Sequence, residues 1–210
     1  MSMKELITEI ETGGHNFVCM TAPPDILPDL PNSDFRLLST QGFIWYEDFV
    51  AFNSIGDRRS YFVKIYLAGE LSFQEDIKRS ILLPYTVQPP GELLVTGSYG
   101  MMCHPFQIPP GKYQLLFEVR YFTDQEIEAS AKYRKLMNEV RGPNGELREE
   151  VRPQLCLFTF IPTTDEVKAE IVHPTYETLI RQRGGVLPSV GFDPRKELVL
   201  HHTSRPPGYP

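Results

Sequence analysis

The adjacent residues Cys103 and His104 bring together a thiol and an imidazole, the two groups of a cysteine nucleophile and its base. If this segment is a strand, successive side chains point to opposite faces, so each group would need a distant partner. The sequence identifies no such partner. A small hydrolase built around Cys103 or His104 therefore remains a hypothesis, which requires an activity that disappears when both residues become alanine.

The other histidines do not predict a metal centre. His201 and His202 are neighbours near the C-terminus, whereas a metal site needs three or more converging donors. The chain has no phosphate-binding loop of the Walker type, no G-x-S-x-G motif, no dinucleotide-binding glycine motif and no C-x-x-C motif. We therefore expect no enzymatic activity, no metal and no cofactor.

The cysteines suggest a reducing compartment. Cys19, Cys103 and Cys156 are odd in number, have no paired spacing and lie in apolar stretches, as buried free thiols do. The N-terminus lacks the apolar region of a secretion signal, and the most apolar run, Leu155 to Ile161, is too short to span a bilayer. We expect a cytoplasmic protein.

Acidic residues in connections between strands are the candidate binding groups. Their spacing lacks the alternation and the glycine of an EF-hand loop, so calcium binding is not indicated. On a rigid framework such carboxylates would present negative charge to a basic partner, where phosphates of DNA would otherwise bind. The residues expected to contact a protein partner are Glu47, Asp48, Asp57, Glu75 and Asp76.

The net charge has the sign that this interpretation requires. The whole chain carries −6, and the segment from Thr175 onward carries three acids and five bases, which leaves −8 on the preceding body. Proteins that bind nucleic acid or anionic membranes concentrate Lys and Arg instead. The charge excludes those classes and permits a basic protein partner.

Strands are the elements that must position these loops. Tyr113 to Tyr121 alternates apolar and polar residues, and Gln154 to Ile161 is apolar on both faces, which indicates a central strand. Pro84 favours an edge position for the strand it lies in, and Pro-Pro-Gly at 89–91 and 109–111 indicates tight turns between antiparallel strands. The further strands expected are Phe17–Thr21, Gly42–Tyr46, Phe49–Asn53, Tyr61–Ala68, Ile77–Val87 and Leu93–Thr96.

Their number and spacing predict a mainly β protein, an antiparallel β-sandwich with one inserted helix and a C-terminal extension. An aromatic cluster near its start is either a binding platform or part of the core, and core packing is favoured because aromatic side chains bury so much apolar area. The cluster consists of Phe43, Trp45, Tyr46, Phe49 and Phe52.

Two helices are expected. Ser2 to Ile10 has the spacing of a short amphipathic helix. Thr123 and Glu126 form a capping box, which opens a second helix over about 123–141. The apolar stripe predicted for it is Ala129, Tyr133, Leu136, Met137 and Val140. The expected organisation is an N-terminal helix over 1–14, a β-sandwich domain over 15–173 and a C-terminal extension over 174–210.

Three segments carry a resemblance to a known family: the strand Ser60–Leu67, the sequence Leu-Pro-Tyr-Thr-Val at 83–87, and Ile-Pro-Pro-Gly-Lys-Tyr-Gln-Leu at 108–115. With them, Ser60 to Phe122 resembles the competence protein J family, the nuclease inhibitors of transformable bacteria. The resemblance implies a non-catalytic inhibitor that occupies the active face of a DNA nuclease. The alternative is an assembly subunit of a larger complex that docks through its C-terminal tail.

Overall fold

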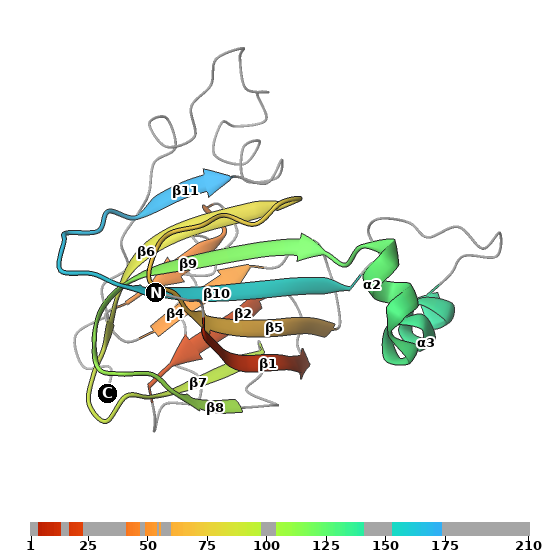
Figure 1. Cartoon of the computed structure of the whole chain (residues 1–210), viewed down its shortest axis with the longest axis horizontal. Coiled ribbons are helices and arrows are strands. Elements are labelled where there is room, and N and C mark those ends of the chain that lie inside the picture. Colours follow the sequence, from red (N-terminus) through yellow and green to blue (C-terminus); the bar gives the residue numbers. More distant parts are fainter. Residues whose placement is uncertain are drawn as a thin grey trace, which may run out of the picture.

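Two β-sheets lie face to face in the computed structural model of the chain, with alternating apolar residues between them. The structure describes residues 4–13, 17–22, 41–46, 49–53, 55, 60–97, 104–140 and 153–173. The six-stranded sheet has the order β1 (Lys4–Gly13), β5 (Ser60–Leu67), β10 (Gln154–Pro162), β9 (Gly111–Tyr121), β6 (Arg79–Val87) and β11 (Glu170–His173). The five-stranded sheet has the order β3 (Phe43–Trp45), β4 (Phe49–Asn53), β2 (Phe17–Thr21), β7 (Glu92–Gly97) and β8 (His104–Gln107). Figure 1 shows the larger sheet in front of the smaller one. The predicted β-sandwich is confirmed.

The predicted N-terminal helix is wrong, because Lys4–Gly13 is the edge strand β1 and pairs antiparallel with β5. The short segment matches a helical spacing, but it is rich in β-branched residues, which favour strands. These residues are Ile7, Thr8, Ile10 and Thr12. Pairing along the free edge of β5 supplies backbone hydrogen bonds that outweigh a weak helix propensity.

Aromatic side chains join the two sheets. Phe52 of β4 stacks on Phe117 of β9 with ring centroids 4.0 Å apart, and Phe158 of β10 packs edge-on against Phe52 at 5.6 Å. All three side chains are fully buried. The cluster predicted around residues 43–52 is buried throughout, so the core interpretation is confirmed over the binding platform.

The strand positions in the larger sheet follow the sequence with one exception. β10 is central, as its two apolar faces predict, although it runs parallel to β5 and the sheet is therefore mixed. β6 is not an edge strand, since β11 pairs beside it at Ser80 to Leu82. Pro84 lies beyond that pairing and faces only β9, so its missing N–H costs no hydrogen bond in the sheet.

The two Pro-Pro-Gly turns lie against each other. Each carries the chain from one sheet to the other, from β6 to β7 and from β8 to β9, rather than joining neighbouring antiparallel strands. The Ile108 amide donates to the Gly91 carbonyl at 2.9 Å, and the Tyr113 hydroxyl donates to the Pro109 carbonyl at 2.6 Å. The pair of turns thus fixes one end of the sandwich.

The inserted helix is divided into α2 (Asp124–Ala129) and α3 (Ala131–Val140), which lie beyond the ends of β9 and β10 in Figure 1. Ser130 between them is extended, with φ −116° and ψ 120°. The break changes which residues face the sheet, so Ala129 is exposed while Ile127 and Tyr133 are buried. Their packing against Phe62 seals one end of the outer face of the larger sheet.

Candidate protein-binding surface

A long connection between β5 and β6 carries two of the predicted contact residues. β5 is parallel to β10, β10 is antiparallel to β9, and β9 is antiparallel to β6, so β5 and β6 run in the same direction with two strands between them. Residues 68–78 must therefore cross from one end of the sheet to the other. We call them the crossover segment.

Hydrogen bonds fix the crossover segment at its two ends and at its middle. The Ala68 amide donates to the Phe160 carbonyl and the Lys78 amide to the Val119 carbonyl, each at 2.9 Å. Midway between them, the Gln74 amide donates to the Glu118 carboxylate at 3.1 Å. Ala68, the first residue of the segment, belongs to an apolar cluster on the outer face of the sheet together with Leu82, Leu116 and Ile161.

Glu118 is a buried carboxylate beneath the crossover segment. The whole residue is 1% exposed, and burial raises its pKa from 4.5 to about 6, partly offset by the Gln74 hydrogen bond. Its neighbour across the strand pair is Ser80, whose buried hydroxyl has no hydrogen-bond partner in the described part of the chain. The carboxylate therefore holds the segment at the cost of its own desolvation.

Glu118→Gln is expected to remove a pH dependence of stability. A carboxyl with a folded pKa above its ordinary value stabilises most below pH 4.5, where it is protonated, and this contribution is lost as the pH rises through about 6. The glutamine oxygen can still accept from Gln74 and carries no charge. Urea unfolding between pH 4.5 and 7 should show the parent losing about 1–2 kcal/mol relative to the variant. A constant difference across that range would show that Glu118 does not titrate there.

Glu75 and Asp76 form an exposed turn within the crossover segment. Asp76 adopts φ +57°, a conformation in which aspartate is tolerated better than most residues. Its negative charge acts on Arg120 and helps to raise the pKa of that guanidinium, whose largest cause is the hydrogen bond to Glu126. Both side chains are exposed, so each presents its charge to solvent.

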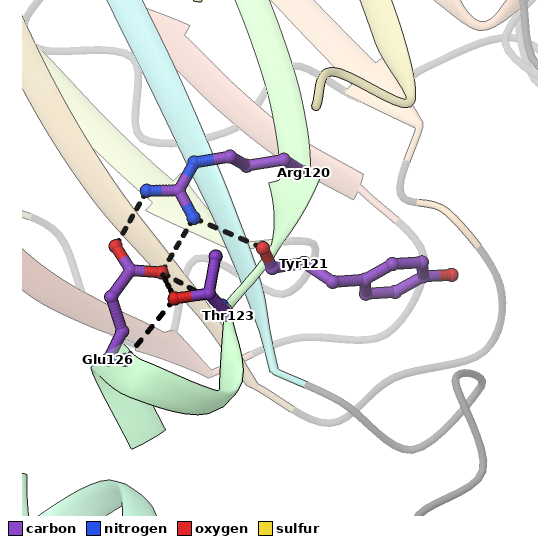
Figure 2. A network of polar contacts seen from close by, with 4 residues as sticks. All are labelled: Arg120, Tyr121, Thr123 and Glu126. Carbon is purple, nitrogen blue, oxygen red and sulfur yellow. Dashed lines mark hydrogen bonds and ion pairs between the residues drawn. The ribbon is translucent and has the colours of Figure 1, made fainter. Parts of the chain in front are cut away.

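A polar network fixes α2 beside this surface (Figure 2). Arg120 donates two hydrogen bonds to the Glu126 carboxylate, both at 2.7 Å, and the Glu126 amide donates to the Thr123 hydroxyl at 3.2 Å. The predicted capping box is confirmed. Arg120 is the main cause that lowers the pKa of Glu126 to about 2, so the ion pair persists through the physiological pH range.

The remaining predicted contact residues and the tail are outside the described residues. Glu47, Asp48 and Asp57 lie there, as do residues 174–210 with His201 and His202. The structure therefore brings together only Glu75 and Asp76. The docking role proposed for the tail and the three other acids stay predictions.

The described residues contain no arrangement of side chains that supports a cysteine nucleophile. Cys103 lies outside them, and His104 is on β8 with a buried Nε2 that has no partner there. Burial raises the pKa of Cys156 to about 12 and that of Cys19 well above its ordinary value, which disfavours a reactive thiolate at either residue. In the ranges described, no three His, Cys, Asp or Glu side chains gather as metal ligands.

Sequence reasoning missed the burial of Glu118 and the exposure of Leu71 and Phe73 in the crossover segment. The alternation of β9 correctly placed Glu118 on the outer face, but no local pattern shows that a distant loop covers it.

Within the described residues, no helix is long and apolar enough to cross a membrane.

Comparison with known proteins places this framework in a family. The family model "Competence protein J (ComJ)" matches residues 14–161, which extends the resemblance seen over Ser60 to Phe122. No curated protein matches the sequence. Two solved structures match over most of this chain. One is ComJ, inhibitor of the DNA degrading activity of NucA, from Bacillus subtilis, with 13% identity and a TM-score of 0.49 over 78% of this chain and 100% of that chain.

The second solved structure is that of Crocagin biosynthetic gene J, with 16% identity and a TM-score of 0.46 over 77% of this chain and 99% of that chain. The family match alone spans well over half of the sequence. The chain therefore belongs to the competence protein J family.

Proposed function

We propose that the chain is a non-catalytic inhibitor of a DNA nuclease and acts by covering the nuclease's active face. The observation that carries the proposal is the family match over residues 14–161. The Bacillus subtilis protein of this family is an inhibitor of the DNA degrading activity of NucA. Membership of the same family supports an inhibitor role for this chain, directed at a nuclease of its own organism.

Charge supports the proposal independently. A nuclease must bind a polyanion, so its cleft is expected to be rich in Lys and Arg. The acidic body of the chain, at −8 before residue 175, has the complementary sign. The proposed anionic contacts are Glu47, Asp48, Asp57, Glu75 and Asp76.

The turn of the crossover segment offers one position at which charge can be changed without disturbing the backbone. Glu75 and Asp76 are both exposed, but Asp76 adopts φ +57°, a conformation that most replacement residues would disfavour. Glu75 is therefore the position that tests the contribution of charge to association.

Glu75→Lys is expected to weaken inhibition of DNA cleavage about fivefold to tenfold, mainly through slower association that depends on salt. The probe is the nuclease retained from an extract of the source organism on the immobilised chain and then purified. Residual cleavage of linear duplex DNA is measured against inhibitor concentration at low and high salt.

The matched control is Glu166→Lys, an equal change of charge at an exposed residue on the connection between β10 and β11. It should inhibit nearly as well as the parent. Equal weakening by both variants would assign the effect to net charge alone and remove Glu75 from the interface. If the parent chain retains no nuclease and leaves DNA cleavage unchanged, the inhibitor role itself is wrong.

A further inference from the structure

We propose that Leu71 and Phe73 of the crossover segment are the apolar anchor of the partner interface and enter a recess on the nuclease that is rimmed by basic residues. This inference rests on the proposed function for the class of partner. It adds the surface that docks and the chemistry of the surface that receives it.

Leu71 and Phe73 stand apart from the other large apolar side chains of the described residues. Leu71 is 39% exposed and Phe73 is 44% exposed, and they are the two exposed large apolar side chains of the residues whose burial is described. Single exposed apolar residues are common on soluble proteins. Two of them lie only two positions apart on one exposed loop, which makes this loop the candidate for an apolar contact with a partner.

The segment that displays them is held in place before any partner binds. Its two ends are tied to Phe160 and Val119, and its middle to the buried carboxylate of Glu118. Gln74, which makes the middle contact, directly follows Phe73. A pre-ordered loop loses little conformational entropy on binding, so its apolar side chains contribute more to affinity.

The charges around the pair select the partner. Glu70, Glu75 and Asp76 flank the two apolar residues, and Lys78 at the end of the crossover segment is its one cation. Apolar side chains within an acidic rim fit a recess surrounded by cationic side chains. The same rim disfavours a second copy of this chain, which would bring identical negative charges, and it disfavours an anionic membrane surface.

An apolar centre with a charged rim predicts how binding energy is distributed. Residues at the dry centre of an interface account for most of the loss on truncation, while charged residues at its rim mainly affect association rate. The Leu71 and Phe73 side chains should therefore influence the dissociation rate, and Glu75 the association rate. Measuring the two rates therefore distinguishes the effect of the apolar anchor from the effect of the negative charge of the acidic body.

The test compares Leu71→Ala/Phe73→Ala with Ser72→Ala, a variant of the exposed residue between them. The probe is the purified nuclease that the immobilised parent chain retains. The double variant should bind it at least about 30-fold more weakly, through faster dissociation, and should lose inhibition accordingly. Ser72→Ala should behave as the parent, and circular dichroism should show that both variants keep the parent's fold.

Three outcomes overturn the inference, and they separate it from the proposed function. If the parent inhibits the nuclease and the double variant inhibits it equally well, the anchor is wrong while the inhibitor role stands. If the parent sediments as a dimer that the double variant dissociates, the patch serves self-association. If the parent neither retains nor inhibits a nuclease, the inhibitor role fails and the anchor fails with it.

Discussion

Phe117→Ala is expected to lower the free energy of unfolding by about 3–5 kcal/mol, the range for removing a large aromatic side chain from a close-packed core. Phe117 is fully buried and contacts aromatic rings from both sheets. Its ring centroid lies 4.0 Å from that of Phe52 across the sandwich and 5.2 Å from that of Phe158 on the neighbouring strand. The substitution would open a cavity where the two sheets meet. Filling that cavity would require both sheets to move, so most of the lost packing would not be recovered.

Urea unfolding followed by fluorescence and circular dichroism measures this effect. The matched control is Phe73→Ala, the same chemical change at a side chain that is 44% exposed, which should cost less than about 0.5 kcal/mol. A loss at Phe117 below about 1 kcal/mol would mean that the two sheets do not pack through this cluster.

Gly91→Ala is expected to destabilise the protein by at least about 2 kcal/mol. Gly91 has φ +88°, and a methyl group there would lie 2.3 Å from the Ile108 carbonyl oxygen. That oxygen belongs to backbone of the second Pro-Pro-Gly turn and cannot rotate away as a flexible side chain would. The substitution would therefore separate the two turns or break the hydrogen bond from Ile108 to Gly91.

The thermal unfolding midpoint of Gly91→Ala should fall by several degrees, in line with the expected loss of stability. Gly69→Ala provides the comparison, because Gly69 is exposed and is not among the glycines with positive φ. Equal midpoints for the two variants would contradict the packed arrangement of the turns.

The strands of the core were predictable because alternating apolar residues mark β9 and an unbroken apolar run marks β10. β9 and β10 lie where their sequences place them, and the aromatic residues around Phe49 are buried as expected. β1 was misassigned because its short sequence fits a helical spacing as well as a strand, and only its pairing with β5 decides between them. The inserted helix is divided at one residue, Ser130, which has an extended backbone. Local helix propensity does not reveal that conformation.

The candidate binding surface was predictable only in part, for a physical reason. Glu75 and Asp76 were placed correctly in a connection between strands, where charge and turn propensity are local properties. Whether Glu118 is buried and whether Phe73 is exposed depend on where the crossover segment lies, which is set by contacts between distant residues. Apolar residues in a loop do not recur at a regular spacing. The sequence therefore does not show whether such a residue is exposed for binding or buried in the core.

Family membership confirms the expectation of a non-catalytic protein. A sandwich held together by its aromatic core can present a loop without needing that loop for stability. The crossover segment is suited to this use, since it is fixed at three points and leaves its apolar and acidic side chains in solvent.

The most direct measurement is a titration of the purified partner nuclease with the intact chain, in which binding and DNA cleavage are followed on the same samples. The proposed inhibitor role predicts that cleavage falls in proportion to the complex formed and ceases once every nuclease molecule carries one chain. A complex that forms fully while the nuclease continues to cleave DNA at its original rate would contradict it.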